Sequence, residues 1–458
     1  MIKLYSKRSL WGTHRTYQES LEYDKIIENV FEKSSKEVYG TKSSPEMAIF
    51  AYGSPGRFEL TGGDSDADVF IAEPKRTEKG NKLRELLEQR WGNYNFSKVD
   101  IPSWGTFEEI ELFLRTSLVE GNQVLETRFV CGNKETKEKV EEIIKEYDSP
   151  QREFFNIVFN RLYFNQYFKQ RIVKGAPNIK YCSGGSREFL FFYWYDRLCN
   201  KLEGKDSSLS GLTQPKVKEG LERLFMEGAI TGNEFGSAFE AVNFIIELRT
   251  DMLKTNKGTS KRGLTLLDDE TILRLQADYK YPKKEEVLKN FREYSNAIKR
   301  VSRVIWNRTI DRASKFKGNY WKKQFFLACN LETPEEERRI ISSEDTLLRT
   351  ALIWGASESS QKTFFNKLSK RYCDSDDWGA LSSIACSPLC EPEVLHNIGT
   401  GKGKEKGYGY ILRVIARNKN TSKKTLKSIV EDVKLEKRYT EVARAALEGG
   451  NELANNQI

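Results

Sequence analysis

The segment from Gly53 to Asp68 combines residue types that could carry phosphate and metal chemistry. Gly53 and Ser54 follow the apolar run 47–52, and a glycine there lets the backbone turn sharply and approach a ligand closely. Ser54 offers a hydroxyl and a backbone N–H, and both groups suit a phosphate at the start of a helix. We therefore expect Gly53 and Ser54 to contact the phosphates of a ligand.

Three aspartates supply the second half of this chemistry. Asp66 and Asp68 stand two residues apart at a predicted strand, and the alternation of a strand places both on one face. Asp100 lies in a later apolar run, where an unpaired charge would be costly. Carboxylate oxygens are ligands of hard cations. Asp66, Asp68 and Asp100 are therefore predicted to be catalytic and to bind Mg²⁺ or Mn²⁺.

Together these residues predict metal-dependent nucleotidyl transfer. A hydroxyl of an acceptor would attack the α-phosphate of a nucleoside triphosphate in line, and pyrophosphate would leave. Asp100 could also accept the proton of that hydroxyl. A single Gly-Ser is usually a turn and a single Asp-x-Asp usually a surface pair, so the prediction depends on their occurrence in order.

Arg57 and Glu59, between the turn and the aspartates, leave two interpretations open. The guanidinium of Arg57 could contact a triphosphate through its planar fork, which would make it a nucleotide-binding residue. Alternatively, Arg57 and Glu59 could form a salt bridge within a helix. The residue types alone favour neither interpretation.

Apolar periodicity predicts the elements that position these residues. A helical lead-in occupies residues 1–44, with apolar residues at helical spacing. A small nucleotidyltransferase domain with α and β elements spans 45–148, and a helical domain rich in aromatic residues spans 149–315. Within the catalytic domain, the predicted strands are 47–52, 67–72 and 96–101, with a helix over 80–90.

The last third of the chain, residues 316–458, is repetitive. Similar stretches begin at Ile353, Ile384 and Ile415, two intervals of 31 residues, and each is followed by a polar turn and an apolar helix. A shorter copy begins at Leu327, and a weaker one lies at Ala446 and Leu447, a further 31 residues after Ile415. A fixed period near 30 predicts an α-solenoid of the HEAT-like or leucine-rich-repeat-variant class. Its concave surface would suit a protein partner.

Composition narrows the class of protein. The net charge of +9 fits contact with phosphates without requiring nucleic acid. Two histidines are too few for a His-rich metallohydrolase domain, and seven cysteines without a CxxC pair suggest reduced thiols. No apolar run is long enough for a membrane span or a signal peptide, so we expect a cytoplasmic protein with no membrane partner. The basic tract 402–407 is expected to be a solvated loop.

Several motifs resemble those of the DNA polymerase β-like nucleotidyltransferases, most closely the bacterial PII uridylyltransferases. One is Gly-Ser-Pro-Gly-Arg-Phe-Glu-Leu at 53–60 with Ser-Asp-Ala-Asp at 65–68. A second is Asn-Ile-Lys-Tyr-Cys-Ser-Gly-Gly-Ser-Arg-Glu-Phe at 178–189, with a tryptophan after it. The segment 125–132 is similar to a helix of the family, and 247–276 weakly echoes a later helical segment. The resemblance covers about residues 47–310.

The resemblance implies an α+β fold: a polymerase β-like domain, then an all-helical domain, here followed by the predicted solenoid. It implies Gly53 and Ser54 at the triphosphate and the three aspartates at the metals. It also implies that Lys180 and Arg187 lie near the nucleotide or the acceptor. From the residues alone, 184–185 is a loop before a helix beginning near Arg187, and a plain loop with a solvated lysine stays open for Lys180.

The chain departs from that family because it lacks the histidines of an HD domain and the βαββαβ pattern of an ACT domain. Our first hypothesis is therefore transfer of UMP or AMP to a hydroxyl of a protein acceptor recruited by the repeats. The second is transfer to RNA, such as tRNA, or synthesis of a small nucleotide. The third is a non-catalytic scaffold.

Overall fold

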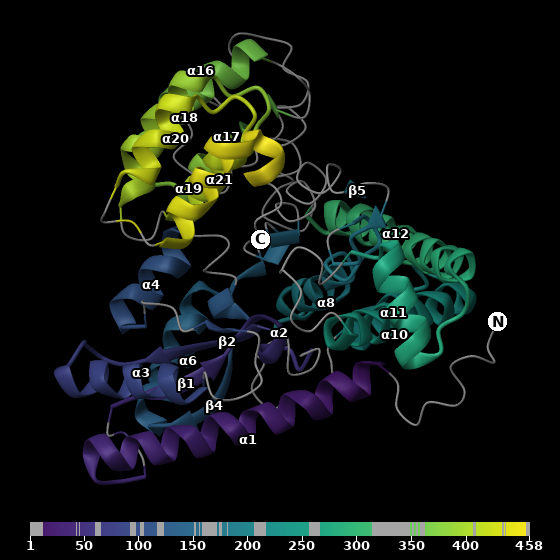
Figure 1. The fold of residues 1–458 in the computed structure, drawn as a ribbon, viewed down its shortest axis with the longest axis horizontal. Helices are drawn as coiled ribbons and strands as arrows, with labels where there is room; N and C mark the ends of the chain where they lie inside the picture. The colour runs from purple at the N-terminus through teal and green to yellow at the C-terminus, as the bar shows by residue number, and fades with distance from the viewer. Residues whose placement is uncertain are drawn as a thin grey trace. The chain divides into compact units, whose positions relative to one another are not determined.

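The structure is a computed structural model of the 458-residue chain. It forms two compact units, one of residues 1–114 and 122–309 and the other of residues 115–121 and 310–458. We call them the first and the second unit (Figure 1). The described residues are 12–42, 44, 46–59, 66–91, 98–100, 105–116, 123–150, 153–154, 156–157, 172–173, 176–180, 182–205, 217–255, 266–313, 349, 352–353, 356–357, 362–405, 409–432, 435 and 437–454.

A four-stranded mixed sheet forms the centre of one half of the first unit. Its strand order is β3-β2-β1-β4, with β1 antiparallel to β2 and β4, and β2 parallel to β3. All four residues of β1 are buried, which explains why its sequence is a continuous apolar run rather than an alternating one. The strands are β1 (Ala48–Ala51), β2 (Asp66–Ala72), β3 (Lys98–Asp100) and β4 (Arg128–Gly132).

Helices cover both faces of this sheet (Figure 1). On one face, side chains of α1 (Gly12–Tyr39) and α3 (Glu78–Trp91) form a core with alternate strand residues such as Ile49 and Ile71. On the other, α4 (Phe107–Thr116) and α6 (Lys134–Tyr147) pack on Phe50 and other strand residues. Because successive side chains of a strand point to opposite faces, the same strands contribute residues to both cores.

The predicted strands at 47–52, 67–72 and 96–101 correspond to β1, β2 and β3, and the predicted helix over 80–90 corresponds to α3. The expectation for 125–132 is wrong, because residues 128–132 form strand β4 and not a helix. The pairing of β4 with β1 decides this conformation, and no local pattern reports that pairing.

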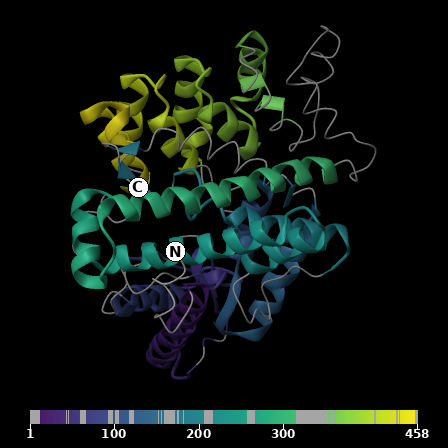
Figure 2. The same ribbon diagram turned by 90° about the vertical axis from the view of Figure 1, so that its right-hand side faces the viewer.

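The other half of the first unit is helical and joins the sheet half through α1, which contacts both β4 and α10. Figure 2 shows its two long helices, α10 and α12. The rings of Phe244 on α10 and Tyr294 on α12 lie with their centroids 4.6 Å apart. A two-stranded ribbon, β5 (Ile172–Val173) with β6 (Ala176–Pro177), also belongs to the described residues. The helices are α8 (Leu190–Leu202), α9 (Val217–Met226), α10 (Gly232–Thr255), α11 (Asp269–Tyr279) and α12 (Lys284–Ala313).

The second unit contains a series of short helices. The helices that follow the polar turn of each repeat, α16, α18 and α20, begin at Lys362, Pro392 and Lys423, at intervals close to the predicted period. Polar side chains cap several of them, as Ser422 caps α20 by accepting from the Thr425 amide. The helices are α16 (Lys362–Tyr372), α17 (Trp378–Cys386), α18 (Pro392–Thr400), α19 (Gly409–Arg417), α20 (Lys423–Val430) and α21 (Lys437–Ala454), with a 3₁₀ turn at Lys402–Lys404.

Equivalent polar residues link successive repeats. The hydroxyls of Ser357 and Ser387 lie 2.7 Å apart, and the side-chain amide of Asn418 donates to the carbonyls of Ala385 and Ser387 at 2.8 Å. Since such bonds satisfy the ends of helices, they explain why the polar turn recurs with the spacing. The solenoid class of this array stays a prediction.

The chain is mostly helical with a small sheet, which agrees with the α+β class. The four-part domain division stays a prediction. The predicted repeat copy that begins at Leu327 and residues 158–171 of the predicted helical domain lie outside the described residues. Among the helices that are described, none is both long enough and apolar enough to cross a membrane.

Candidate functional site

The Gly53-Ser54 turn lies directly beside a predicted metal ligand. Residues Gly53–Gly56 form the single helical turn α2, and Gly53 has a φ of +60°, a conformation that favours glycine. A Cβ on Gly53 would lie 3.0 Å from the Oδ2 atom of Asp68. The backbone N–H of Tyr52 also donates to the carbonyl of Asp68 at 3.1 Å. The turn and the Asp68 carboxylate are therefore in close contact.

The backbone of the sheet brings two of the three predicted aspartates to neighbouring positions. In the parallel pairing of β2 with β3, Asp68 is the register partner of Asp100. Asp66 lies two residues before Asp68, at the first position of β2. The side chains of Asp66 and Asp100 lie outside the described part of the chain. Carboxylates at these positions are the donor type that a divalent hard cation takes, so the three residues could hold one.

One small pocket of the first unit gathers predicted nucleotide-binding residues from separate segments. Ser54 and Arg57 come from the turn after β1, and Lys180 and Arg187 come from the loop before α8. This grouping joins two motifs more than 120 residues apart in the sequence. The pocket is lined by Ser54, Arg57, Glu59, Lys180, Ser186, Arg187, Phe189, Leu190, Ile246 and Arg249.

Arg57 is held by two carboxylates. Its Nε donates to Glu59 at 3.0 Å, and its Nη1 pairs with Glu126. All three residues are buried. Burial opposes the charge of Arg57, but the carboxylates of Glu126 and Glu59 outweigh that effect and raise the pKa of the guanidinium. Arg57 and Glu59 therefore form an ion pair, although in the turn after α2 and not within a helix. A triphosphate contact of Arg57 stays a prediction.

Glu126 connects the turn to the helical half of the unit. Its second oxygen accepts from the indole Nε1 of Trp194 on α8, while the first accepts from Arg57. The carbonyl of Glu126 would lie 2.3 Å from a Cβ on Gly56, so only glycine fits at that point of the turn. Trp194 is the tryptophan that follows the second sequence motif, and its contact links that motif to the first.

The loop carrying Lys180 and Arg187 has internal polar contacts. The amide of Lys180 donates to the side chain of Asn178 at 3.0 Å, and the hydroxyl of Ser183 donates to Glu188 at 3.2 Å. Gly184 has a φ of +78°, and a Cβ there would lie 2.3 Å from the carbonyl of Ser295 on α12. Helix α8 begins at Leu190, so the prediction of a helix start near Arg187 is three residues too early.

Two charged residues of the pocket, Arg249 and Glu59, were not among the predicted site residues. Arg249 lies on α10, and its only sequence signal is the weak resemblance that begins at residue 247. Glu59 is 6% exposed, and its Oε1 atom has no hydrogen-bond partner among the described residues. Burial raises the pKa of Glu59, and Arg57 only partly opposes this. The pocket thus contains several cations and one incompletely satisfied carboxylate.

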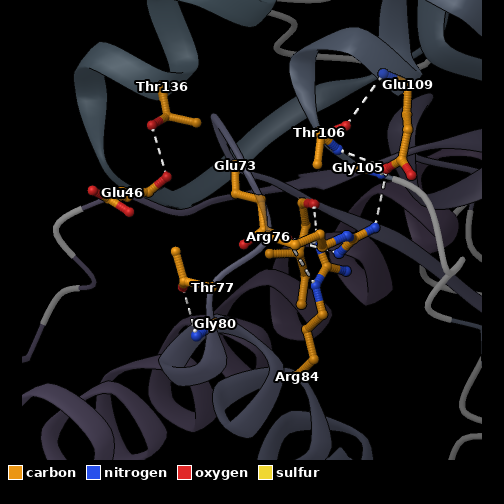
Figure 3. Close-up of polar contacts among 11 residues, drawn as sticks. Glu46, Glu73, Arg76, Thr77, Gly80, Arg84, Gly105, Thr106, Glu109 and Thr136 are labelled. Carbon is orange, nitrogen blue, oxygen red and sulfur yellow. Dashed lines mark hydrogen bonds and ion pairs between the residues drawn. The ribbon is translucent and has the colours of Figure 1, made fainter.

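The other end of β2 contains a second ion network (Figure 3). Glu73 accepts from Arg76 at 2.7 Å and from Arg84 at 2.9 Å, and Arg84 also donates to the carbonyl of Ile71 at 2.7 Å. Glu109 accepts from Arg76 at 3.1 Å and, as Figure 3 shows, lies at the backbone of Gly105 and Thr106, the start of α4. This network connects the end of β2 to α4 through ion pairs.

Comparison with known proteins identifies a related family. A family model described as GlnD PII-uridylyltransferase matches residues 165–307. This chain is similar to the PII uridylyltransferases. Two Haemophilus influenzae proteins, from strain 86-028NP and strain ATCC 51907 / DSM 11121 / KW20 / Rd, are each 26% identical to it over 151 and 150 residues. Both are described as bifunctional uridylyltransferase/uridylyl-removing enzymes.

The comparison confirms the resemblance to the uridylyltransferases that the motifs predicted. The matched segments of the relatives cover 32% of this chain and 17% of each relative, so the chain spans about a sixth of their length. The family model covers the loop of Lys180 and Arg187 and also α10, but not the turn at Gly53. The family match therefore includes the pocket residues of the helical half but not those of the turn after β1.

Proposed function

We propose that this chain is a nucleotidyltransferase that moves UMP or AMP from a nucleoside triphosphate to a hydroxyl of a protein acceptor and releases pyrophosphate. The observation that carries the proposal is the pocket in which Ser54 meets Lys180 and Arg187. Its cations, including Arg249, suit the charge of the two terminal phosphates. The similarity to uridylyltransferases over the helical half supports the same class of reaction.

In the proposed reaction, the acceptor oxygen forms a bond to the α-phosphorus while the bond from that phosphorus to the β-phosphate oxygen breaks. The electron pair of the broken bond leaves with pyrophosphate, and the proton of the hydroxyl passes to Asp100 or to water. Ser54, Lys180 and Arg187 hold the β- and γ-phosphates and stabilise the charge that develops on the leaving group.

Asp66, Asp68 and Asp100 would hold Mg²⁺ or Mn²⁺, which when bound supplies positive charge at the reacting phosphate. Support for this assignment comes from the sheet, where Asp68 is the register partner of Asp100, and from Gly53 in the turn beside Asp68. A side chain at residue 53 would crowd Oδ2 at 3.0 Å. The carboxylate oxygens match the preference of these cations.

A protein acceptor fits the second unit, whose linked helices at a period near 31 residues favour an extended binding surface. Its described residues contain a hollow with more basic than acidic side chains, lined by Lys404, Lys423, Lys424, Lys427, Ser428, Glu431 and Asp432. Such a surface would also attract RNA, so the acceptor is decided by the test below.

The test incubates the protein with each of the four labelled nucleoside triphosphates, Mg²⁺ or Mn²⁺, and a cell lysate. We expect label on a protein band that protease removes and ribonuclease leaves. Replacing Asp66 and Asp68 together by alanine should lower the rate by about 10³-fold, since metal and positioning effects supply several kcal/mol.

The matched control replaces Asp374 and Asp376 by alanine, because these residues have the same spacing but lie on an exposed turn of the second unit. The control variant should keep its activity. Equal activity in wild type and the Asp66/Asp68 variant would overturn the site assignment, and label that only ribonuclease removes would replace the protein acceptor by RNA.

A further inference from the structure

Helix α1 contacts both halves of the first unit, at β4 and at α10. We propose that α1 sets the separation of the two walls of the pocket, acting through two ion-pair anchors, Asp24 on the sheet side and Arg15 on the helical side. One wall is the turn that bears Ser54, and the other includes Arg249 on α10. The inference rests on the proposed function only for the identity of the ligand.

The first anchor joins α1 to the turn through Arg128 of β4. Asp24 accepts two hydrogen bonds from this guanidinium, at 2.6 Å from Nη1 and 2.9 Å from Nη2. The Nη2 atom also donates to the carbonyl of Pro55, the third residue of the turn, at 3.2 Å. Arg128 is 9% exposed, so this bidentate pair is little screened by water. A shift of α1 would therefore displace the turn.

Phe58 adds a second contact of α1 with the same turn. It has a φ of +57°, an unfavourable conformation for a residue with a side chain. Its ring lies 5.0 Å from that of Tyr17 on α1, and the guanidinium carbon of Arg128 lies 4.0 Å from its centroid. The strained residue is thus held between α1 and Arg128, and its neighbour Glu59 lines the pocket.

The second anchor joins α1 to α10. Arg15 donates to Asp251 at 3.4 Å, and Glu19 lies 3.6 Å from the ammonium of Lys254. The side chain of Asp251 is only 1% exposed and also accepts from Tyr281 at 3.1 Å. Asp251 follows Arg249 by two residues, so an anchor at Asp251 fixes the part of α10 that carries the pocket cation.

The two anchors lie nine residues apart on one continuous helix, a rise of about 13 Å. A helix resists compression along its axis, so a position fixed at Asp24 determines the position at Arg15. An anion that spans the pocket needs both walls at the correct separation. A displacement of about 1 Å can therefore lower the reaction rate up to about a hundredfold. Asp24 and Arg15 are positioning residues, since neither lines the pocket.

The experiment replaces Asp24 and Asp251 by asparagine, singly and together, and measures two quantities. The first is hydrogen exchange of the turn amides at 57–59, which bond within the turn. The second is the Kd for pyrophosphate by calorimetry. We expect Asp251→Asn to speed exchange in the distant turn at least about fivefold and to raise the Kd about tenfold. In the double variant, the fold-change of each quantity should be smaller than the product of the two single-variant fold-changes, because the loss of either anchor alone already frees the helix.

The control is Glu37→Gln, which removes the pair between α1 and Arg90 of α3 and touches neither wall. It should change neither quantity. Unchanged turn exchange in Asp251→Asn, or independent effects in the double variant, would overturn the proposal. If the wild type fails to bind pyrophosphate while turn exchange still responds to Asp251→Asn, the ligand assignment fails and the role of α1 stands.

Discussion

The two ends of β2 each carry a buried arginine paired with buried glutamates, but the two sets of ion pairs have different roles. At the end near Glu73, Arg76 and Arg84 both pair with Glu73, and Arg76 also pairs with Glu109, so the charges neutralise one another. At the end near Asp68, Arg57 pairs with Glu59 and Glu126 at the edge of a pocket that holds further cations. The first set of ion pairs fastens a helix, and the second supports a pocket.

The difference lies in the balance of charge and in where the chain supplies it. Around Glu73 the charged residues all come from the sheet half, within about 36 residues of sequence. Around the turn, Lys180, Arg187 and Arg249 come from the helical half and exceed the local carboxylates. An excess of cations at a junction of two substructures suits an anionic ligand, whereas a closed network has no need of one.

The largest expected effect separates the two networks. Glu126→Gln and Glu73→Gln each remove one charge from a buried pair, and each should lower the free energy of unfolding by about 3–5 kcal/mol. Only Glu126→Gln should also weaken pyrophosphate binding, because Glu126 holds Arg57 at the pocket. Urea unfolding and calorimetry measure both quantities. A binding loss of the same size in both variants would break the distinction.

A smaller effect should follow when the glycine near each end of β2 is replaced by alanine. Gly53→Ala introduces a Cβ at a φ of +60°, 3.0 Å from Asp68 Oδ2, so we expect about 1–2 kcal/mol of destabilisation with a large fall in transfer rate. Gly105→Ala places a Cβ 2.0 Å from the carbonyl of Ile71 and should destabilise more. If the transfer rate per folded molecule is as low in Gly105→Ala as in Gly53→Ala, the turn at Gly53 has no specific role in transfer.

The smallest effect concerns pH. Burial raises the pKa of Glu59 above its ordinary value of 4.5. Its contribution to stability is therefore fully present below the unfolded-state pKa and is lost as the pH rises through the folded-state pKa. Wild type should thus gain stability relative to Glu59→Gln as the pH falls, which urea unfolding at a series of pH values measures.

Protonation of Glu59 also removes a negative charge from the pocket. The ratio of pyrophosphate Kd values, wild type over Glu59→Gln, should fall toward one at low pH, since the protonation of pyrophosphate itself cancels in that ratio. A ratio that stays constant from pH 7 to the acid limit would show that Glu59 does not face the ligand.

Local patterns predicted several elements because their physical cause is local. The run 47–52 became β1, which is buried on both faces, and the helically spaced apolar residues of 21–31 lie in α1. The segment 125–132 was mispredicted because its conformation comes from pairing with β1. The repeat period is visible in sequence because equivalent side chains, such as Ser387 and Asn418, must bond across neighbouring units.

The sequence by itself determined which chemistry was available: a Gly-Ser turn, spaced aspartates, and a Lys-Arg loop resembling uridylyltransferases. Only the tertiary structure decided which of these residues share a pocket, that Arg57 is held by Glu126, and that Arg249 of α10 joins them. The physical reason is distance along the chain. The grouping of residues 54, 187 and 249 in one pocket and the pairing of residues 57 and 126 depend on the packing of separate elements, and packing leaves no periodic trace in any one of them.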